Sequence, residues 1–153
     1  MLEVERVSWL TAQYTVRDDA GHAGTWTRPR FRERVAGDID GERYELLPDG
    51  PRRLSLMQAG AEVASADAAT SWRWTISAGE RTYELGRKSV WHSELELRSG
   101  GRVVGSIRRA KGAHLKLLCD LPGDLPPATQ AFIAFVVLTM WSRAAAKAGE
   151  GGG

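Results

Sequence analysis

The last quarter of the chain contains a long segment without a charged residue. No charge occurs between Leu125 and Ser142, and residues 132–141 read Phe-Ile-Ala-Phe-Val-Val-Leu-Thr-Met-Trp. A helix that is apolar on every side offers no face to water, so either protein or lipid must surround it. The segment therefore predicts either the core helix of a globular domain or a helix that inserts in a membrane.

The length and the flanking residues of this segment favour a core helix. Spanning a bilayer takes about 20 predominantly apolar residues, whereas this segment begins with Pro126-Pro127 and includes Thr129 and Gln130. Alanine, arginine and lysine favour helix, so we expect the helix to run from Pro127 to Lys147. We predict that this helix is buried in the protein, with insertion in a membrane as the alternative.

Before residue 120 the sequence is typical of short antiparallel strands. Alternation such as Leu95-Glu-Leu97 leaves one face of a strand apolar, as in a sheet with one wet face. Glycine turns separate the apolar runs, at Asp40-Gly41, Asp49-Gly50, Ala78-Gly79 and Ser99-Gly100-Gly101. The predicted strands are 6–16, 24–27, 31–36, 43–47, 53–58, 62–66, 72–77, 81–85, 93–98, 102–109 and 114–118. We therefore expect about eleven strands followed by one helix.

The strand region also contains a near-repeat. Tyr44-Glu-Leu recurs as Tyr83-Glu-Leu, and a longer pattern recurs at a constant offset of 41 residues. In this pattern Leu54, Leu56, Gly60, Val63 and Ser65 match Leu95, Leu97, Gly101, Val104 and Ser106. Any two hairpins with leucines around a glycine turn look partly alike, but we favour a real duplication. Duplicated hairpins followed by an apolar helix predict a closed barrel with that helix as its core, because closure removes exposed strand edges.

This pattern resembles the superfamily that contains the tubby C-terminal domain, the LURP-one-related proteins and the phospholipid scramblases. The resemblance rests on the two Tyr-Glu-Leu hairpins and on the segment from Leu125-Pro-Pro to Trp141, and it covers Glu42 to Lys147 better than the first forty residues. It implies a mainly β fold, an antiparallel barrel of about 11–12 strands in two related halves, with the hydrophobic C-terminal helix buried in the core. It carries over no functional residue.

Length and composition fit one ordinary domain. The chain has 153 residues, of which 26% are charged and 42% apolar, so we expect a barrel domain over 1–148 and a disordered glycine-rich tail over 149–153. The formal net charge of +2 is too small to indicate a nucleic-acid partner. Usage of alanine, arginine, glycine and tryptophan suggests a high-GC bacterial source.

The expected location is the cytoplasm, with peripheral contact to a membrane. The sequence opens with Met1-Leu-Glu-Val-Glu-Arg6, which is unlike a secretory signal. Cys119 is the only cysteine, so no intramolecular disulfide can form.

Neither catalysis nor metal binding has support in the sequence. His22, His92 and His114 have no partner at metal-ligand spacing. The segment 38–42 resembles the start of a calcium loop but lacks the further ligands, and a hairpin turn explains it better. Cys119 ends an apolar strand, where we expect a buried and inert thiol. A catalytic set of Ser106, His114 and Asp120 could be assembled only by arbitrary selection of residues. We therefore expect a non-enzymatic protein with no metal and no cofactor.

Basic residues of the hairpin 102–118 form the candidate binding site. If Val103, Gly105 and Ile107 face the core, then Arg102 and Arg108 face outward. On the next strand, if Leu115 and Leu117 face inward, His114 and Lys116 face outward. The candidate site for an anion or a lipid headgroup comprises Arg102, Arg108, Arg109, Lys111, His114 and Lys116. A merely solvated surface is the alternative. A rival basic patch comprises Arg28, Arg30, Arg32 and Arg34, which alternate along the predicted strand 31–36 and its approach, with Glu33 on the opposite face.

The leading hypothesis is a non-enzymatic binding module that contacts anionic phospholipid headgroups through the basic hairpin. The alternatives are a soluble protein-interaction or regulatory module, a carrier of a small apolar ligand, and a protein anchored by its last helix. If the helix threads the barrel, Phe132, Phe135 and Trp141 would fill the space that a carried ligand needs. Trp72-Arg-Trp74 fits a barrel wall, and Trp91 fits a loop that touches a membrane. The sequence leaves the ligand, the partner and the oligomeric state open.

Overall fold

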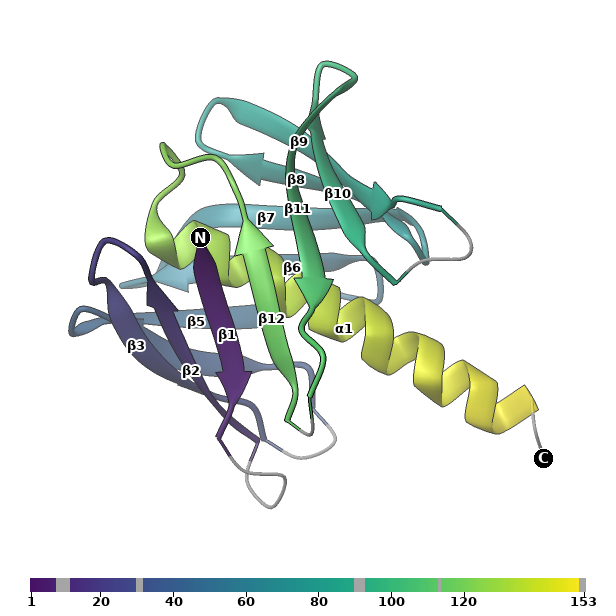
Figure 1. The fold of residues 1–153 in the computed structure, drawn as a ribbon, viewed down its shortest axis with the longest axis horizontal. Coiled ribbons are helices and arrows are strands. Elements are labelled where there is room, and N and C mark those ends of the chain that lie inside the picture. Colours follow the sequence, from purple (N-terminus) through teal and green to yellow (C-terminus); the bar gives the residue numbers. More distant parts are fainter. Residues whose placement is uncertain (8–11, 30–31, 90–92, 113, 152–153) are drawn as a thin grey trace.

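The computed structural model describes residues 1–7, 12–29, 32–89, 93–112 and 114–151. Twelve antiparallel strands form a closed barrel, and one long helix follows them (Figure 1). The elements are β1 (Leu2–Arg6), β2 (Gln13–Asp18), β3 (Ala23–Thr27), β4 (Val35–Ile39), β5 (Glu42–Pro48), β6 (Arg53–Gln58), β7 (Ala61–Thr70), β8 (Arg73–Ala78), β9 (Arg81–Arg87), β10 (Leu95–Ser99), β11 (Arg102–Arg109), β12 (Lys116–Asp120) and α1 (Pro127–Gly151).

Each strand pairs with its neighbours in sequence, and the first and last strands close the barrel. β1 lies antiparallel to β12, with Leu2 opposite Cys119 and Glu5 opposite Lys116. A closed meander leaves no unpaired strand edge for another chain to extend. The predicted mainly β barrel is therefore confirmed.

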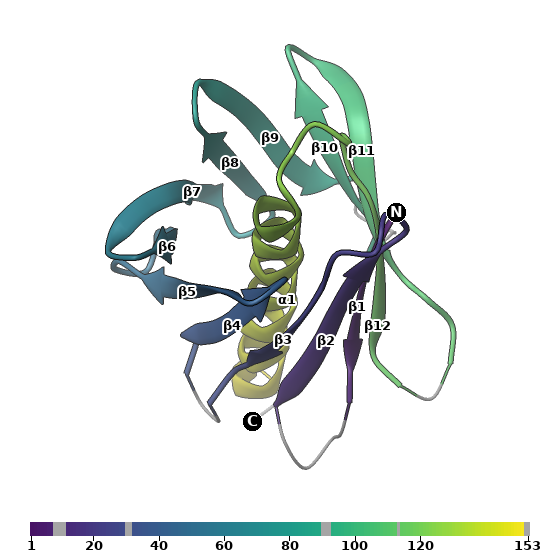
Figure 2. The same cartoon turned by 90° about the vertical axis from the view of Figure 1, so that its left-hand side faces the viewer.

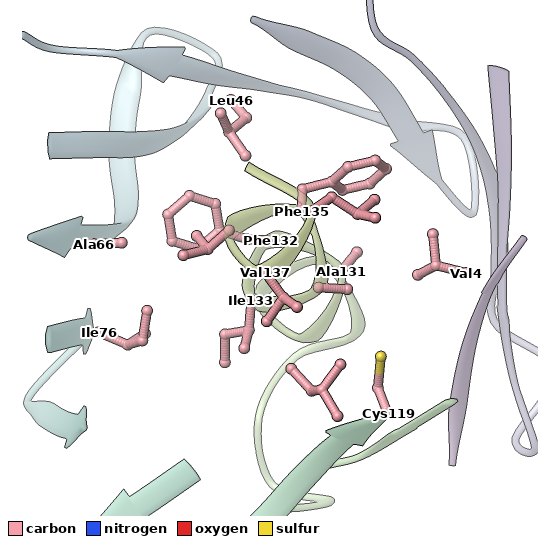
Figure 3. Close-up of a cluster of buried hydrophobic side chains, with 14 of the residues drawn as sticks. Val4, Leu46, Ala66, Ile76, Cys119, Ala131, Phe132, Ile133, Phe135 and Val137 are labelled. Carbon is pink, nitrogen blue, oxygen red and sulfur yellow. The ribbon is translucent and has the colours of Figure 1, made fainter. Parts of the chain in front are cut away.

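The helix α1 runs through the barrel and forms its core. Figure 2 shows α1 obliquely with strands around it, and Figure 3 shows its side chains pointing to the wall in several directions. Every residue from Thr129 to Met140 is buried, which is why the segment needs no polar face. Strand residues that alternate along the wall cover it, among them Val4, Leu46, Ala66, Ile76 and Cys119.

Beyond Trp141 the helix leaves the barrel and extends past the ends of the strands (Figure 1). By length and composition Pro127–Gly149 could cross a membrane, but 56% of its apolar window is buried inside the protein. The core-helix prediction therefore describes the structure. The helix continues to Gly151, so the tail expected to begin at residue 149 is helical as far as the described residues reach.

Aromatic rings fix the helix against β2 and β3. The Phe135 ring packs edge-on against Tyr14 and stacks on Trp26, each with ring centroids 5.3 Å apart. Trp26 lies opposite Gly37 of β4, and a Cβ atom at residue 37 would come within 2.4 Å of the indole ring. Glycine is therefore required where this large side chain crosses the neighbouring strand.

Most predicted strands are present, and two predictions need correction. The strands 53–58 and 102–109 have the predicted bounds. The single strand 6–16 is wrong, because the chain forms β1 and β2 instead. The predicted strand 31–36 is also misplaced, because β4 begins only at Val35. Arg28, Arg32 and Arg34 lie in the connection that precedes β4. Arg30 and Phe31, which belong to the same stretch of sequence, lie outside the described residues.

The near-repeat corresponds to two hairpins of the same shape. Leu54 and Leu56 of β6 and Leu95 and Leu97 of β10 are completely buried. Both hairpins have a register shift after the second leucine and a two-residue turn in which both residues have positive φ. That turn type matches the twist of paired strands. The equivalent residues of the sequence pattern thus occupy equivalent places.

Candidate functional site

The connections at one end of the barrel are acidic. Because the strands alternate in direction, 19–22, 40–41, 59–60, 79–80, 100–101 and 121–126 all lie at the end where α1 begins. We call this the acidic end. Its acidic residues are Asp19, Asp40, Glu80 and Asp124, and no lysine or arginine occurs in these connections, all of which are described.

The connections at the opposite end are mainly basic, and we call it the basic end. This is the end where α1 leaves the barrel. The described cations of its connections are Arg28, Arg32, Arg34, Arg52, Lys88 and Lys111, and α1 adds Arg143 and Lys147. The described acidic residues of these connections are Glu33, Asp49 and Glu94, and α1 includes Glu150 near its end. The formal net charge of +2 therefore hides a barrel with ends of opposite charge.

A hollow of about 570 Å³ at the basic end gathers arginines from distant parts of the chain. Its floor includes Tyr14 and Leu138, both buried. Its arginines are Arg6 of β1, Arg28 and Arg32 of the β3–β4 connection, Arg109 of β11 and Arg143 of α1. We call this hollow the arginine pocket. Among the described residues that line it, Glu33 is the only acidic one.

Glu33 is held by Arg143 in a bidentate ion pair. The Arg143 Nε and Nη2 groups donate to the two carboxylate oxygens at 2.6 and 2.7 Å, and Nη1 donates to the Pro51 carbonyl at 2.7 Å. These hydrogen bonds, with the charges of Arg143 and Arg28, lower the pKa of Glu33 although partial burial opposes this. The guanidinium carbon of Arg143 also lies 5.4 Å from the centre of the Trp74 ring. The pair ties α1 to the barrel and occupies the carboxylate of Glu33.

Three of the other arginines of the pocket, Arg28, Arg32 and Arg109, have no such ion pair with a described residue. No carboxylate of a described residue lies within 4 Å of the guanidinium nitrogens of Arg28, Arg32 or Arg109. The Arg28 Nε group donates to the Arg32 carbonyl at 2.9 Å, which fixes this connection and leaves the terminal nitrogens of Arg28 without a hydrogen-bond partner among the described residues. Guanidinium groups form planar paired hydrogen bonds with phosphate and carboxylate oxygens. The arrangement suits a bound anion.

The structure divides the six residues of the predicted site among four places. Arg109 lies opposite Leu117, on the inward register, and lines the arginine pocket. Lys111 and His114 are exposed in the β11–β12 connection at the basic end. Arg108 and Lys116 lie on the outer wall, where Lys116 is 3.5 Å from Glu3. Arg102 lies at the acidic end, next to the turn 100–101.

The prediction that Val103 faces the core is wrong. A β-bulge between Leu97 and Arg98 places Gly105 opposite Leu97 but Val103 opposite Arg98. A bulge adds one residue to one strand and so reverses its alternation. Val103 is therefore 52% exposed, and Arg102 does not share a face with Arg108.

The rival basic patch contributes more to the pocket than the hairpin does. Arg28 and Arg32 line it together with Arg109, whereas Arg34 pairs with Glu45 at 2.8 Å and Arg30 lies outside the described residues. The sequence reasoning missed Arg6 and Arg143. A signal was present: in a closed meander the first, third and eleventh connections lie at the same end, so their basic residues meet there.

Other candidate chemistry is not assembled in the described part of the chain. No group of three or more His, Cys, Asp or Glu residues there is placed to hold a metal ion. Asp40 and Gly41 form the predicted hairpin turn, with φ of 51° and 84°. Ser106 lies opposite Asp120, whereas His114 is in a connection at the basic end. Trp91 and His92 lie outside the described residues.

Comparisons with protein-family models, with curated proteins and with solved structures returned no match for this chain.

Proposed function

We propose that the protein is a non-enzymatic, cytoplasmic binding module whose basic end docks on an anionic phospholipid surface. The arginine pocket receives the phosphate of a headgroup, and the exposed cations around it face the charged surface. The resemblance to the tubby and scramblase superfamily supports this proposal only at the level of fold, because a fold does not determine a function.

The single observation that carries the proposal is the convergence of Arg28, Arg32 and Arg109 around one hollow without a carboxylate partner among the described residues. Several other arginines of the strands are neutralised locally; Arg53, for example, is paired with Glu62 and Asp67. Like charges that converge repel one another, so their convergence is stabilised when an anion binds. Each cation close to an anionic membrane contributes about 1 kcal/mol of attraction.

The location of these cations also favours a surface as the target. Lys111, His114 and Arg52 are exposed at the same end as the pocket, so they add to the positive charge that an anionic surface would attract. The acidic end would face away from that surface. Such a distribution orients the molecule before it makes contact.

The test is flotation with vesicles of phosphatidylcholine alone and with added phosphatidylserine, at low and high salt. The variant Arg32→Glu/Arg109→Glu reverses two exposed cations of the pocket. The matched control Arg43→Glu/Arg102→Glu makes the same change of net charge at exposed residues near the acidic end. We expect the first variant to lose at least about tenfold in affinity for anionic vesicles, and the control to bind within about twofold of the wild type.

Binding that is insensitive to salt, or equal loss in both variants, contradicts the proposal. The first result would indicate insertion of α1, because apolar insertion is not screened by salt. The second would indicate a response to net charge alone. Melting temperatures of both variants establish that the barrel is intact.

A further inference from the structure

A second hollow lies beside α1 at the basic end. It has a volume of about 980 Å³, within the size range of sites that bind small molecules. The Glu33–Arg143 ion pair lies between this hollow and the arginine pocket, because both residues line both of them. We call this second hollow the Trp74 groove. Its apolar lining comes from Pro51, Ala68, Trp72, Trp74, Met140 and Ala144.

The apolar part of the groove exists because large, buried side chains form its base and small side chains form its sides. Trp74 and Met140 are buried, with 1% and 2% of their surface exposed. Ala68 of β7 and Ala144 of α1 are half-buried, and their methyl groups leave the space between strand and helix open. An aliphatic chain in this space would remove apolar surface from water, at about 25 cal/mol for each Å².

Two polar features give the groove a preference for an anionic ligand. Arg52 and Lys147 line it, are exposed, and have no carboxylate of a described residue within 4 Å. Glu33, the acidic lining residue, is engaged by Arg143.

We propose that the Trp74 groove binds a long-chain aliphatic carboxylate, with the chain between Ala68 and Ala144 and the carboxylate towards Arg52 and Lys147. The interior of the barrel cannot hold such a ligand because residues 129–140 of α1 fill it. The site therefore lies beside the helix rather than inside the barrel. This proposal does not depend on docking to a membrane.

The test is calorimetric titration with dodecanoate as a monomer, without vesicles, compared with dodecanol and with butyrate. The variant Ala144→Phe fills the groove. The matched control Ala145→Phe makes the same change at the next residue, which is exposed and lines neither hollow. A second variant, Arg52→Glu/Lys147→Glu, changes only exposed side chains and leaves the apolar lining intact.

We expect dodecanoate to bind more tightly than dodecanol or butyrate. Ala144→Phe should weaken it at least about tenfold, because one displaced chain segment corresponds to more than 1.4 kcal/mol, and Ala145→Phe should bind within about twofold of the wild type. The double charge reversal should weaken dodecanoate about threefold to tenfold and leave dodecanol unchanged.

Absence of dodecanoate binding by the wild type overturns the proposal. So does equal binding of dodecanoate by Ala144→Phe and the wild type, or a preference for dodecanol. If flotation on anionic vesicles fails while dodecanoate binds, only the membrane proposal is lost. If flotation on anionic vesicles succeeds while dodecanoate does not bind, only the groove proposal is lost.

Discussion

Cys119 shows how a place in the barrel wall determines the chemistry of a side chain. It lies opposite Leu2 on one side and Ile107 on the other, and its side chain points at α1 (Figure 3). Burial raises the pKa of its thiol to about 12. Only the thiolate is a nucleophile, so this cysteine is inert while the barrel is folded. The expectation of a buried thiol is confirmed.

We predict that Cys119 does not react with Ellman's reagent in the native protein over hours at pH 8. In guanidinium the same sample should release one equivalent of chromophore, because unfolding exposes the thiol and restores its ordinary pKa. Comparable rates in both conditions would show that the barrel opens readily around β12.

His22 and Asp40 form an exposed pair at the acidic end. The His22 Nδ1 atom lies 2.5 Å from an Asp40 carboxylate oxygen, and this hydrogen bond raises the pKa of the imidazole. The same contact, with a hydrogen bond from the Ala23 amide, lowers the pKa of Asp40. Because the folded pKa of His22 is raised, its stabilising effect is complete below the ordinary histidine pKa and is lost as the pH rises through the raised value. The effect of Asp40 is lost as the pH falls through its lowered pKa.

An NMR titration of the imidazole protons checks this pair. The midpoint of His22 should lie above the ordinary value of 6.5, and Asp40→Asn should lower it. The control Glu80→Gln removes a charge at the same end and should have a smaller effect on the midpoint. A midpoint that Asp40→Asn leaves unchanged would mean that the pair does not form in solution.

At the scale of elements, the account depends on α1 being the core of the barrel. Phe135 packs on Tyr14 and Trp26 and is 1% exposed. Truncating it should lower the free energy of unfolding by about 3–5 kcal/mol, from lost burial and a cavity that the wall cannot fill. Urea denaturation of Phe135→Ala measures this, with Lys147→Ala on the exposed part of α1 as a control that should change stability by less than about 0.5 kcal/mol. Equal stability of both variants would contradict a core role for the helix.

The β6–β7 turn contains a strained residue. Ala59 has φ of +50°, a conformation that costs an L residue with a side chain about 1–2 kcal/mol, and its counterpart in the β10–β11 turn is Gly100. Ala59→Gly should therefore raise the free energy of unfolding by about 0.5–1 kcal/mol. Ala61→Gly, two residues later in β7, should lower it by a similar amount because no strain is relieved there. Two equal effects of the same sign would argue against the strained turn.

The elements were predictable where one local pattern dominates. The uncharged segment predicted α1 as a core helix, and glycine turns beside alternating leucines predicted the β6–β7 and β10–β11 hairpins. β1 was missed because Glu3 and Glu5 made its start look like a charged terminus, although Leu2 and Val4 alternate with them and are buried. The bulge in β11 could not be predicted, because Val103 and Val104 are equally apolar and either could face the core.

The binding site was less predictable than the fold for a geometric reason. Arg6, Arg28, Arg109 and Arg143 come from four distant parts of the chain, and only closure of the meander brings them to one end. The sequence identified Arg109 within the hairpin and Arg28 and Arg32 within the rival patch as separate features. That these arginines meet at one end follows from counting the connections around a closed barrel. This count requires the correct number of strands, which includes β1.

At the scale of the whole molecule, the two ends of the barrel carry opposite charge while the net charge is small. This distribution predicts a fixed orientation on an anionic surface, with the basic end down. It also places the arginine pocket, the Trp74 groove and the emerging end of α1 on the side that meets the surface. Docking, in this account, is a property of the distribution of charge and not of its sum.

The measurement that tests this orientation most directly uses an environment-sensitive fluorophore at each end. Because Cys119 is buried, a new exposed cysteine can be labelled selectively, at His114→Cys on the basic end or at Glu80→Cys on the acidic end. With phosphatidylserine vesicles at low salt, the account predicts a blue shift of the label at residue 114 and no shift at residue 80, and neither shift with phosphatidylcholine alone. Equal shifts of both labels, or a shift at residue 80 only, would contradict it.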